Sequence, residues 1–363
     1  MGLRVPEILV FLRLLDHDRG FPSTRTCLTG LATGLSAVPA CSACHAVRKS
    51  SRRREQCAMM AVNISYPHVT ARRFEGGTMP PHALDLDAYL NRIGGLPMPP
   101  APSLPVLQAI VARHTATIPF ENLDVVLGRP VRLDLDSIQA KLVARQRGGY
   151  CFEHNTLLHA ALRRLGFDAA ILMARVVMGA DEDAERPRTH TLVRVTLPEG
   201  AWLADVGFGN LTPTAPLSLT TGEAQSTPHE VFRIRDRGCD RVLQANRDAT
   251  WQPLYRFAME TTYPIDHVVA NWFTSTCPGG LFTSNLVVAA PGPGCRNTLF
   301  NGRLTVRQVG DAPQTRMIQD ASDLRATLRD RFNLVIDPDD AAPLYAAMRR
   351  FADNANPAMQ IDG

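Results

Sequence analysis

The run Arg147-Gly148-Gly149-Tyr150-Cys151-Phe152-Glu153-His154-Asn155 decides the architecture of this chain. Its two glycines let the backbone turn sharply, and apolar residues with helical spacing follow as far as Leu165. We therefore expect a helix that starts around Cys151. A thiol in the first turn of a helix feels the positive end of the helix dipole, which favours the thiolate. The run predicts that Cys151 is a nucleophile.

Two further signals follow Cys151 in order along the chain. Thr189-His190-Thr191 opens an alternating apolar run, and Asp205 ends the next β-rich segment. The short connection Pro198-Glu199-Gly200 predicts a β-hairpin, which brings the start of one strand beside the end of the next. Asp205 is then placed to orient the imidazole of His190, as in Cys-His-Asp triads. The three residues together predict acyl transfer through a thioester.

Each member of this set has a plainer interpretation when it is taken alone. A cysteine at a helix start is usually inert packing, a strand histidine usually satisfies a backbone carbonyl, and an aspartate before Val-Gly is typical of a turn. Their order, together with the Arg-Gly-Gly-x-Cys context, favours catalysis. His154 and His159 are the rival bases, but both are expected on the Cys151 helix itself, from which neither reaches the thiol.

The charge of the chain excludes a nucleic-acid-binding body. Lys and Arg number 39 against 35 Asp and Glu. Residues 1–78 alone hold 11 of the basic residues and 5 of the acidic ones. The rest of the chain is therefore slightly acidic, so we expect no nucleic-acid partner. No apolar run reaches the ~20 residues that would span a bilayer, so we expect no membrane partner.

Cysteine and lysine usage indicate the cellular setting. The eight cysteines lie at wide and irregular spacing, which argues against a disulfide scaffold and favours the reducing cytoplasm. Lys49 and Lys141 are the only lysines, and every other basic residue is Arg. Because Arg codons are rich in G and C, we interpret this bias as the mark of a GC-rich bacterial genome rather than as a binding signal.

Residues 1–83 are interpreted as an N-terminal extension that is disordered or an artefact of start-site assignment. A basic cluster at 48–54 has flanks without periodicity, and acidic residues interrupt the apolar start that a signal peptide needs. A zinc knuckle would have one good ligand pair and no second pair among its candidates, Cys41, Cys44, Cys57 and His68. We expect no metal. Codons for Glu75-Gly76-Gly77 can form a ribosome-binding sequence, so we expect translation to begin at Met79.

From residue 85 onward the pattern predicts an α+β protein in several parts. Helices are expected to start at four positions, Asp85 or Asp87, Ser103, Ser137 (ending near Arg147) and Cys151. Three β-rich segments follow, at 170–178, 190–197 and 201–206, with more short strands to about residue 260. Strand-like pieces come later, at 286–289 and 304–309. Two helices follow them, at 322–332 and 341–351. The order is a helical unit (84–166), a β unit (167–275) and a smaller mixed unit (276–363).

These motifs together resemble the arylamine N-acetyltransferase family. The resemblance spans about residues 84–310 and is carried by five motifs, Ile118-Pro119-Phe120-Glu121-Asn122-Leu123, the run 147–155, Thr189-His190, Asp205-Val206-Gly207-Phe208-Gly209 and Asn271-Trp272-Phe273-x-Ser275. It implies a helical bundle, a β-barrel and an α/β lid around a papain-like Cys-His-Asp core, in the three ranges given above.

The resemblance also implies a ping-pong reaction in xenobiotic metabolism. Cys151 would take acetyl from acetyl-CoA as co-substrate, with no permanently bound cofactor. An aromatic amine or hydrazine would then collect the acetyl group, and N-hydroxyarylamines could be O-acetylated. His190 would hold the thiolate as an ion pair and later accept a proton, and Asp205 would orient it. We expect a monomer or a homodimer.

The same matching implies further site residues. Val177, Phe208 and Phe282 would line the slot for the aryl ring, although core packing is the plainer role for the two phenylalanines. Arg147 and Glu121 would form a structural ion pair beside the site. The loop 207–214 would offer backbone N–H groups to CoA phosphates, at Gly207, Gly209, Thr212 and Thr214, although it is equally typical of a turn.

The sequence departs from the family pattern in one place near the site. Where the family commonly shows His-Pro-x-Ser-x-Phe, this chain has Cys277-Pro278-Gly279-Gly280-Leu281-Phe282. The change affects the rim of the acceptor and CoA clefts and leaves the triad untouched. The two glycines would make this edge more mobile.

Three other functions compete with arylamine acetylation. An amide synthase acting on a polyketide acyl chain would share the triad and differ only in substrate. A hydrolase or transglutaminase-like enzyme would need water or a glutamine side chain at the thioester, whereas Val177, Phe208 and Phe282 predict a dry slot. A binding protein that only sequesters amines would have no use for the complete set of Cys151, His190 and Asp205.

Overall fold

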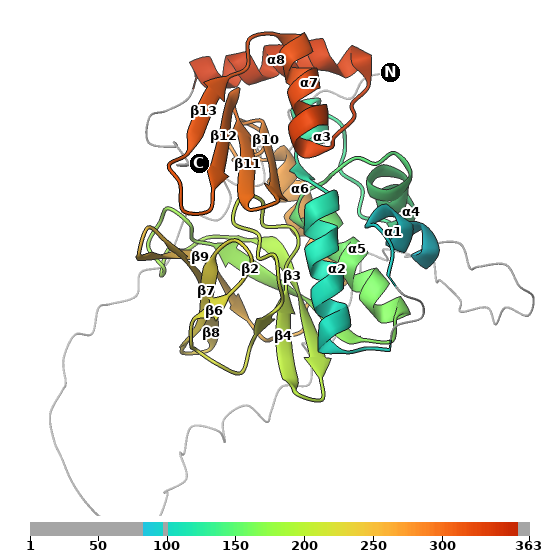
Figure 1. Ribbon diagram of the computed structural model, residues 1–363, viewed down its shortest axis with the longest axis vertical. Helices are drawn as coiled ribbons and strands as arrows, with labels where there is room; N and C mark the ends of the chain where they lie inside the picture. Colours follow the sequence, from blue (N-terminus) through green and yellow to red (C-terminus); the bar gives the residue numbers. More distant parts are fainter. Residues whose placement is uncertain (1–82, 97–100, 355–363) are drawn as a thin grey trace, which may run out of the picture. The chain divides into compact units, whose positions relative to one another are not determined.

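The computed structural model describes residues 83–96 and 101–354, and the elements below lie within these ranges. Its helices are α1 (Leu86–Arg92), α2 (Leu104–Thr117), α3 (Leu123–Val126), α4 (Leu135–Ile138), a π-helical segment (Gln139–Ala144), α5 (Cys151–Arg164), α6 (Pro264–Thr276), α7 (Ala321–Phe332) and α8 (Pro338–Asp353). Its strands are β1 (Phe120–Glu121), β2 (Asp168–Val176), β3 (Arg188–Leu197), β4 (Gly200–Ala204), β5 (Leu217–Ser218), β6 (Gln225–Ser226), β7 (Val231–Arg237), β8 (Asp240–Arg247), β9 (Thr250–Ala258), β10 (Val287–Gly292), β11 (Cys295–Phe300), β12 (Arg303–Gln308) and β13 (Gln314–Met317). Figure 1 shows helices first, then a β unit, then a sheet with two helices, which confirms the predicted α+β class.

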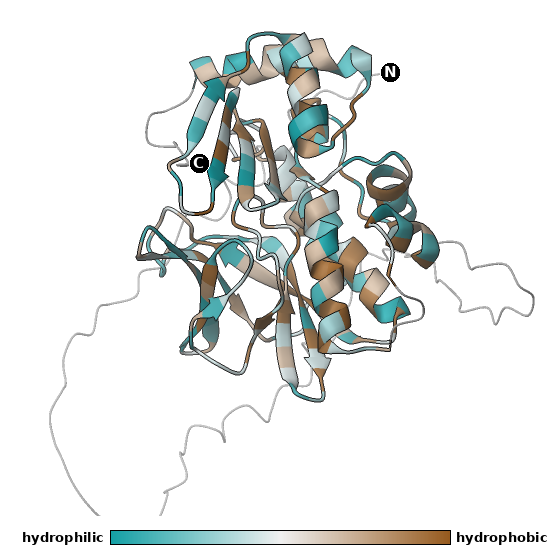
Figure 2. Ribbon diagram, viewed as in Figure 1, coloured by the Kyte–Doolittle hydropathy of each residue, from teal (hydrophilic) through white to brown (hydrophobic). Residues whose placement is uncertain are grey.

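The first helices pack around α5, whose apolar stripe is fully buried. Leu157, Leu158, Ala161 and Leu162 all have 0% exposure and join one core with residues of α1, α2 and β3. The side chain of Asp85 accepts a hydrogen bond from the Ala88 N–H at 2.9 Å and so caps α1. Figure 2 shows apolar and polar residues alternating along α2 and α8, as expected for helices with one buried face.

The β unit is an antiparallel sheet of eight strands, in the order β5-β4-β3-β2-β9-β8-β7-β6. No backbone pairing joins the two edge strands within the described residues. The amide of Gln225 in β6 bridges them instead, accepting from the Ser218 N–H at 2.6 Å and donating to the Ser218 carbonyl at 3.0 Å. The sheet is therefore a nearly closed barrel, and its interior is filled by buried side chains such as Phe232, Leu243 and Phe257.

The last part of the chain forms a second antiparallel sheet, in the order β1-β10-β11-β12-β13. Its first strand, β1, comes from the helical part of the chain and pairs Phe120 with Ala289. The helices α7 and α8 cover this sheet and share a core with it that includes Leu299, Leu324 and Leu344. Because β1 lies between α2 and α5 in sequence, its pairing with β10 joins the helical part of the chain to this sheet.

The structure differs from the sequence prediction at three helices, one of which is the four-residue α3, absent from the prediction. The helix expected from Ser137 to Arg147 begins earlier, because Asp134 rather than Ser137 supplies the capping side chain, and its last turns are π-helical and end at Ala144. The helix α6 is absent from the prediction, because its sequence is rich in β-branched residues that disfavour helices. The strand ranges agree with the prediction to within a few residues.

Two expectations fall on parts of the chain that the structure does not describe. The zinc-ligand candidates and the proposed start at Met79 lie outside the described residues. Within residues 83–96 and 101–354, no group of His, Cys, Asp and Glu side chains could hold a metal ion. The helices in these ranges are also too short or too polar for any of them to cross a membrane.

Candidate active site

Cys151 is the first residue of α5, and the two glycines before it are required by close packing. A Cβ on Gly148 would lie 2.1 Å from the Pro119 carbonyl oxygen, and one on Gly149 would lie 2.7 Å from a carboxylate oxygen of Glu153. That Glu153 oxygen accepts the Tyr150 N–H at 3.1 Å and caps the helix. The glycines therefore let the chain pass close to β1 and α5.

His190 and Asp205 meet at the open end of the β3–β4 hairpin. The register pairs Val193 with Ala204, so the residues just beyond this pair lie side by side. The Nε2 of His190 lies 2.7 Å from the Oδ2 of Asp205, and both side chains are buried. Because Asp205 takes Nε2, the Nδ1 nitrogen is the one left for the thiol of Cys151.

Asn155 locks Asp205 in place from the catalytic helix. Its side-chain amide donates to the Oδ1 of Asp205 at 3.1 Å and to the Thr191 carbonyl at 2.6 Å, and its oxygen accepts the Val206 N–H at 3.2 Å. The Gly207 N–H also donates to the Oδ1 of Asp205, at 2.9 Å. A Cβ on Gly207 would lie 2.8 Å from the Cα of Cys151, so glycine is needed for this approach. Asn155 lies one turn after Cys151 on the same face, a spacing by which the sequence could have indicated it.

The buried charges of the site stabilise a protonated His190. Burial alone would lower the pKa of His190, but the carboxylate of Asp205 and a hydrogen bond with Cys151 outweigh it and raise the pKa to about 10. Burial would raise the pKa of Asp205, but the charge of His190 and the donors Gly207 and Asn155 lower it below its ordinary value. The arrangement favours an imidazolium at His190 beside an ionised Asp205.

We expect the stability contributed by His190 to fall as the pH rises from about 6.5 to about 10. A group whose folded pKa is raised stabilises the fold fully below its unfolded pKa and loses that effect as pH passes its folded pKa. The difference in unfolding free energy between wild type and His190→Gln should be largest near pH 6.5 and shrink toward pH 10 in denaturant titrations. A difference that does not change over this range would contradict the ion pair. The lowered pKa of Asp205 acts in a separate, acidic window.

Two aromatic rings wall the imidazole. The ring centroids of Tyr255 and Phe208 lie 4.8 Å and 5.2 Å from that of His190, and 5.2 Å from each other. Tyr255 is completely buried, and burial together with the nearby Asp205 carboxylate raises the pKa of its hydroxyl well above the ordinary value. Sequence analysis missed Tyr255, because it comes from β9, which is distant in the chain and carries no motif.

A cavity of about 1320 Å³ lies against Cys151 and His190. Phe208 and Phe282, both predicted to line the aryl slot, are among its walls, and Phe282 packs on Phe120 with ring centroids 5.8 Å apart. Val177 does not line the cavity. It is fully buried, and its N–H donates to the Leu254 carbonyl at 2.9 Å. Its neighbours Val176 and Met178 line the cavity in its place, because successive side chains of extended backbone point to opposite sides.

Three of the four loop N–H groups that the sequence predicts to be free donate hydrogen bonds within the protein. The Gly207 N–H is held by Asp205, the Gly209 N–H donates to the Thr212 hydroxyl at 2.7 Å, and the Thr212 N–H donates to the Gly209 carbonyl at 3.1 Å. Thr214 is buried, with its hydroxyl 3.0 Å from the Nδ1 of His229. Of the four predicted CoA contacts, Gly207 alone lines the cavity.

Arg147 and Glu121 belong to a larger buried ion network beneath α5. The Nη2 of Arg147 lies 2.7 Å from the Oε1 of Glu121 and 3.3 Å from Asp124. The ammonium of Lys141 lies 2.8 Å from both Asp124 and Glu153 and 3.8 Å from Glu121. Burial would lower the pKa of Lys141, but the three carboxylates raise it. Glu153 also caps α5, so this network supports the helix end that carries Cys151.

We expect Lys141→Met to destabilise the fold by about 3–5 kcal/mol, because it leaves the buried Glu153 carboxylate without its counter-ion. Lys141 is one of only two lysines in the chain, and its compact ammonium contacts three carboxylates at once. The measurement is the free energy of unfolding in urea. Arg132→Met, which removes an exposed partner of Asp134, is the control, with a loss below about 1 kcal/mol. Equal small losses in both variants would contradict the supporting role of the network.

The two rival histidines are held away from the thiol. The Nδ1 of His154 lies 3.0 Å from the Nε2 of His114, and its Nε2 lies 3.1 Å from the Pro119 carbonyl. Burial lowers the pKa of His154 to about 4. The Nε2 of His159 lies 3.2 Å from the Ala169 carbonyl. Both side chains therefore serve structural hydrogen bonds.

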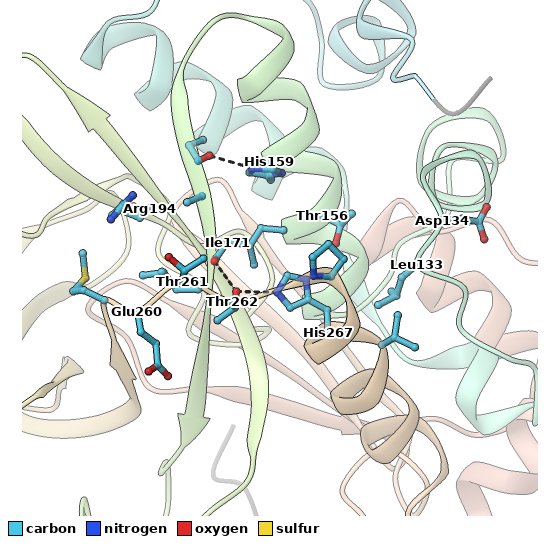
Figure 3. Close-up of a pocket in the computed structure, with 16 residues that line it drawn as sticks. Leu133, Asp134, Thr156, His159, Ile171, Arg194, Glu260, Thr261, Thr262 and His267 are labelled. Atoms are coloured by element: carbon cyan, nitrogen blue, oxygen red, sulfur yellow. Dashed lines mark hydrogen bonds between the residues drawn. The ribbon is translucent and has the colours of Figure 1, made fainter. Parts of the chain in front are cut away.

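A second cavity, of about 640 Å³, lies between α5, α6 and β2 (Figure 3). Figure 3 shows His159 on one helix and His267 on the other, each in a hydrogen bond, with Thr262 bonded to both His267 and the Ile171 carbonyl. No cysteine lines this cavity, and its two histidines lack a carboxylate hydrogen-bond partner among the described residues. The residues predicted for acyl transfer therefore lie at the larger cavity.

The fold gathers a cysteine, a histidine and an aspartate at the larger cavity, a set typical of enzymes that carry acyl groups on a thiol. A family model described as N-acetyltransferase matches residues 103–341. The chain is 45% identical over 256 residues to the arylamine N-acetyltransferase of Mycobacterium tuberculosis (strain ATCC 25618 / H37Rv), over 69% of this chain and 90% of that protein. The chain belongs to the arylamine N-acetyltransferase family, as the sequence motifs indicate.

Two further comparisons extend this assignment. A protein of Salmonella typhimurium described as arylamine N-acetyltransferase / N-hydroxyarylamine O-acetyltransferase is 36% identical over 250 residues, which are 69% of this chain and 88% of that one. The solved structure of the Mycobacterium marinum arylamine N-acetyltransferase in complex with CoA matches with a TM-score of 0.69 and 40% identity, over 74% of this chain and 99% of that chain. The fold thus matches a solved structure in which CoA is bound.

Proposed function

We propose that this protein is an acetyl-CoA-dependent arylamine N-acetyltransferase in which Cys151 carries the acetyl group. The observation that supports it most is the hydrogen bond between His190 and Asp205, with His190 and Cys151 lining the same large cavity, which Phe208 and Phe282 wall. The family to which the chain belongs supports the choice of acetyl-CoA and arylamines. Acetyl-CoA acts as a co-substrate, and no resident cofactor is needed.

In the first half-reaction the thiolate of Cys151 attacks the thioester carbonyl of acetyl-CoA. A carbon–sulfur bond forms at Cys151, and the carbon–sulfur bond to CoA breaks. The departing CoA thiolate takes the proton held on His190, which leaves the imidazole neutral. Asp205 keeps Nε2 protonated throughout, so the Nδ1 nitrogen is the one that gives and takes the proton.

In the second half-reaction the amine nitrogen attacks the acetyl-Cys151 carbonyl. The carbon–nitrogen bond forms, the amine proton passes to His190, and the bond to Cys151 breaks to restore the thiolate–imidazolium pair. A hydrazine reacts through nitrogen in the same way, and an N-hydroxyarylamine through oxygen. The aromatic walls Phe208 and Phe282 exclude water from the thioester, which protects it from hydrolysis.

We infer that arginines of the cavity, rather than the N–H groups of the loop 207–214, contact the CoA phosphates. Four guanidinium groups line the cavity, those of Arg186, Arg247, Arg303 and Arg307. Guanidinium groups bind phosphate oxygens in bidentate pairs and are suited to this role. Arg247 ends β8 of the barrel, and Arg303 and Arg307 lie on β12 of the second sheet, so a bound CoA would reach from the barrel to the second sheet.

We infer a cytoplasmic location, where acetyl-CoA and reduced thiols occur together. The four cysteines of the described residues, Cys151, Cys239, Cys277 and Cys295, are all free thiols. This setting suits an enzyme whose nucleophile must stay reduced.

Initial-rate kinetics with acetyl-CoA and 4-aminosalicylate test the proposed function. A ping-pong enzyme gives parallel lines in double-reciprocal plots, because CoA leaves before the amine reacts. Mass spectrometry of the product should show one acetyl group on the amine nitrogen. Lines that intersect to the left of the axis, or an acetylated product at the background rate, would contradict the proposal.

A further inference from the structure

The helix α6 has its polar side buried and its apolar side exposed. The residues that it buries are His267, Ala270, Asn271 and Thr274. Its exposed side carries five large apolar residues, Ile265, Val268, Val269, Trp272 and Phe273, which we call the α6 face. Trp272 is 66% exposed and Val269 is 61% exposed. This is the reverse of the pattern of a surface helix in a monomeric protein.

The buried hydrogen bonds of α6 fix this orientation. The Asn271 side chain donates to the Val131 carbonyl at 3.0 Å and accepts a hydrogen bond from the Tyr150 hydroxyl. His267 bonds the Thr262 hydroxyl at 3.0 Å, within the cavity of Figure 3. Tyr150 directly precedes the catalytic Cys151, so the helix cannot rotate to bury its apolar side without disturbing the site.

The exposed apolar area is that of one side of a protein interface. Ten large apolar side chains are exposed in the described residues, and seven of them lie between residues 263 and 281. With a fully exposed large side chain taken as about 200 Å², the five residues of the α6 face expose on the order of 550 Å². A monomer rarely exposes more than a few hundred Å² in one patch, and a standard interface buries about 800 Å² on each partner.

The charges around the α6 face favour a second copy of the same chain. Asp266 is the only acidic residue of α6 and its carboxylate is engaged by the Tyr263 N–H at 2.9 Å, while the helix's one basic residue, His267, is buried. The face therefore offers no attraction to nucleic acid or to an anionic membrane, and it does not repel itself. Ion-paired residues border it, because Asp134 and Glu260 line the same cavity as Val268. An apolar centre with a charged rim is the anatomy of a protein–protein interface.

We propose that this chain forms a two-fold symmetric homodimer in which the α6 faces of two copies pack against each other. The exposed residues recur at 265, 268 or 269, and 272 or 273, which is the spacing of a helix-packing seam. In a two-fold symmetric pair, every contact between two residues occurs twice, with the copies exchanged. The same apolar stripe therefore serves as the interface of both partners. The two α6 helices run antiparallel across the axis.

Analytical ultracentrifugation of the full chain tests the proposal with Val269→Glu and a matched control. Val269 does not line either cavity, so its change leaves the sites intact. We expect wild type to sediment as a dimer at tens of micromolar, and V269E as a monomer, with association at least ~100-fold weaker because two carboxylates would be buried in the seam. The control is Val335→Glu, since Val335 is 59% exposed and lies far from α6 in sequence. V335E should remain a dimer.

A charge pair across the axis makes the test specific. Mixing V269E with Val269→Lys should restore the dimer, because opposite charges would then meet. Melting curves of all variants should agree within a few degrees, which separates loss of association from loss of fold. A wild type that stays monomeric at this concentration would overturn the proposal. So would a V269E variant that associates as wild type does.

Discussion

Replacing Cys151 by Ser is expected to lower arylamine acetylation by on the order of 10⁴-fold or more. The two side chains differ by one atom, so the variant should fold, and the buried site loses no large packing group. A serine hydroxyl holds its proton far more tightly than a thiol, so His190 cannot keep it as an ion pair. The measurement is the rate of CoA release from acetyl-CoA with 4-aminosalicylate.

The exposed Cys239 provides the matched control for this variant. Cys239→Ser makes the same chemical change at a free thiol of the β7–β8 turn, away from the cavity. It should leave the rate within about two-fold of wild type. Near-normal activity of C151S, with CoA still released, would end the claim that Cys151 is the nucleophile.

Replacing Asp205 by Asn should lower kcat by up to roughly 10⁴-fold, through the tautomer of His190. The Oδ1 of Asp205 accepts the Gly207 N–H and the Asn155 amide, so an asparagine oxygen is retained on that side. Its NH₂ group then faces the Nε2 of His190 and requires that nitrogen to accept. The imidazole proton then moves to Nδ1. With this proton bound, Nδ1 can no longer accept a proton from the thiol or the amine.

Loss of the buried carboxylate also removes a charge from the core, so stability must be measured beside the rate. A urea titration of D205N separates the two effects, because a folded variant with low kcat reports on the tautomer. Asp236→Asn is the control, since Asp236 is 82% exposed and pairs only with Arg241 at the surface. A D205N enzyme that keeps a tenth or more of wild-type kcat would show that Asp205 does not orient the base.

Local signals made the catalytic centre predictable from the sequence. Cys151 follows two glycines and starts an amphipathic helix, and both features depend on neighbouring residues alone. His190 and Asp205 flank a hairpin whose short turn fixes the distance between them. The structure brings the three side chains together as that reasoning expects, and their catalytic roles stay predictions until variants are measured. The division into 84–166, 167–275 and 276–363 also stays a prediction.

Contacts between distant parts of the chain could not be predicted in the same way. Lys141 reaches Glu121, Asp124 and Glu153 only because the π-helical segment and β1 lie beneath α5. Tyr255 reaches His190 only through the order of strands in the barrel, which the sequence does not specify. Nothing in the sequence indicates the internal hydrogen bonds that engage the N–H groups of Gly207, Gly209 and Thr212.

The case of α6 shows a different limit of sequence patterns. A periodic apolar stripe indicates a helix with two unlike faces, and the usual inference places the apolar face inside. In α6 the polar residues His267 and Asn271 find buried partners, so the polar face is inside. The pattern alone cannot specify this, because it depends on what the neighbouring elements offer.

Intact-protein mass spectrometry after brief mixing with acetyl-CoA tests the central claim most directly. We expect a mass increase of one acetyl group, mapped to Cys151 by peptide analysis. The group should disappear when 4-aminosalicylate is added, with acetylated amine formed in equal amount. C151S should show no such increase. Folded wild-type protein that gains no acetyl group, or gains it at a residue other than Cys151, would contradict the account.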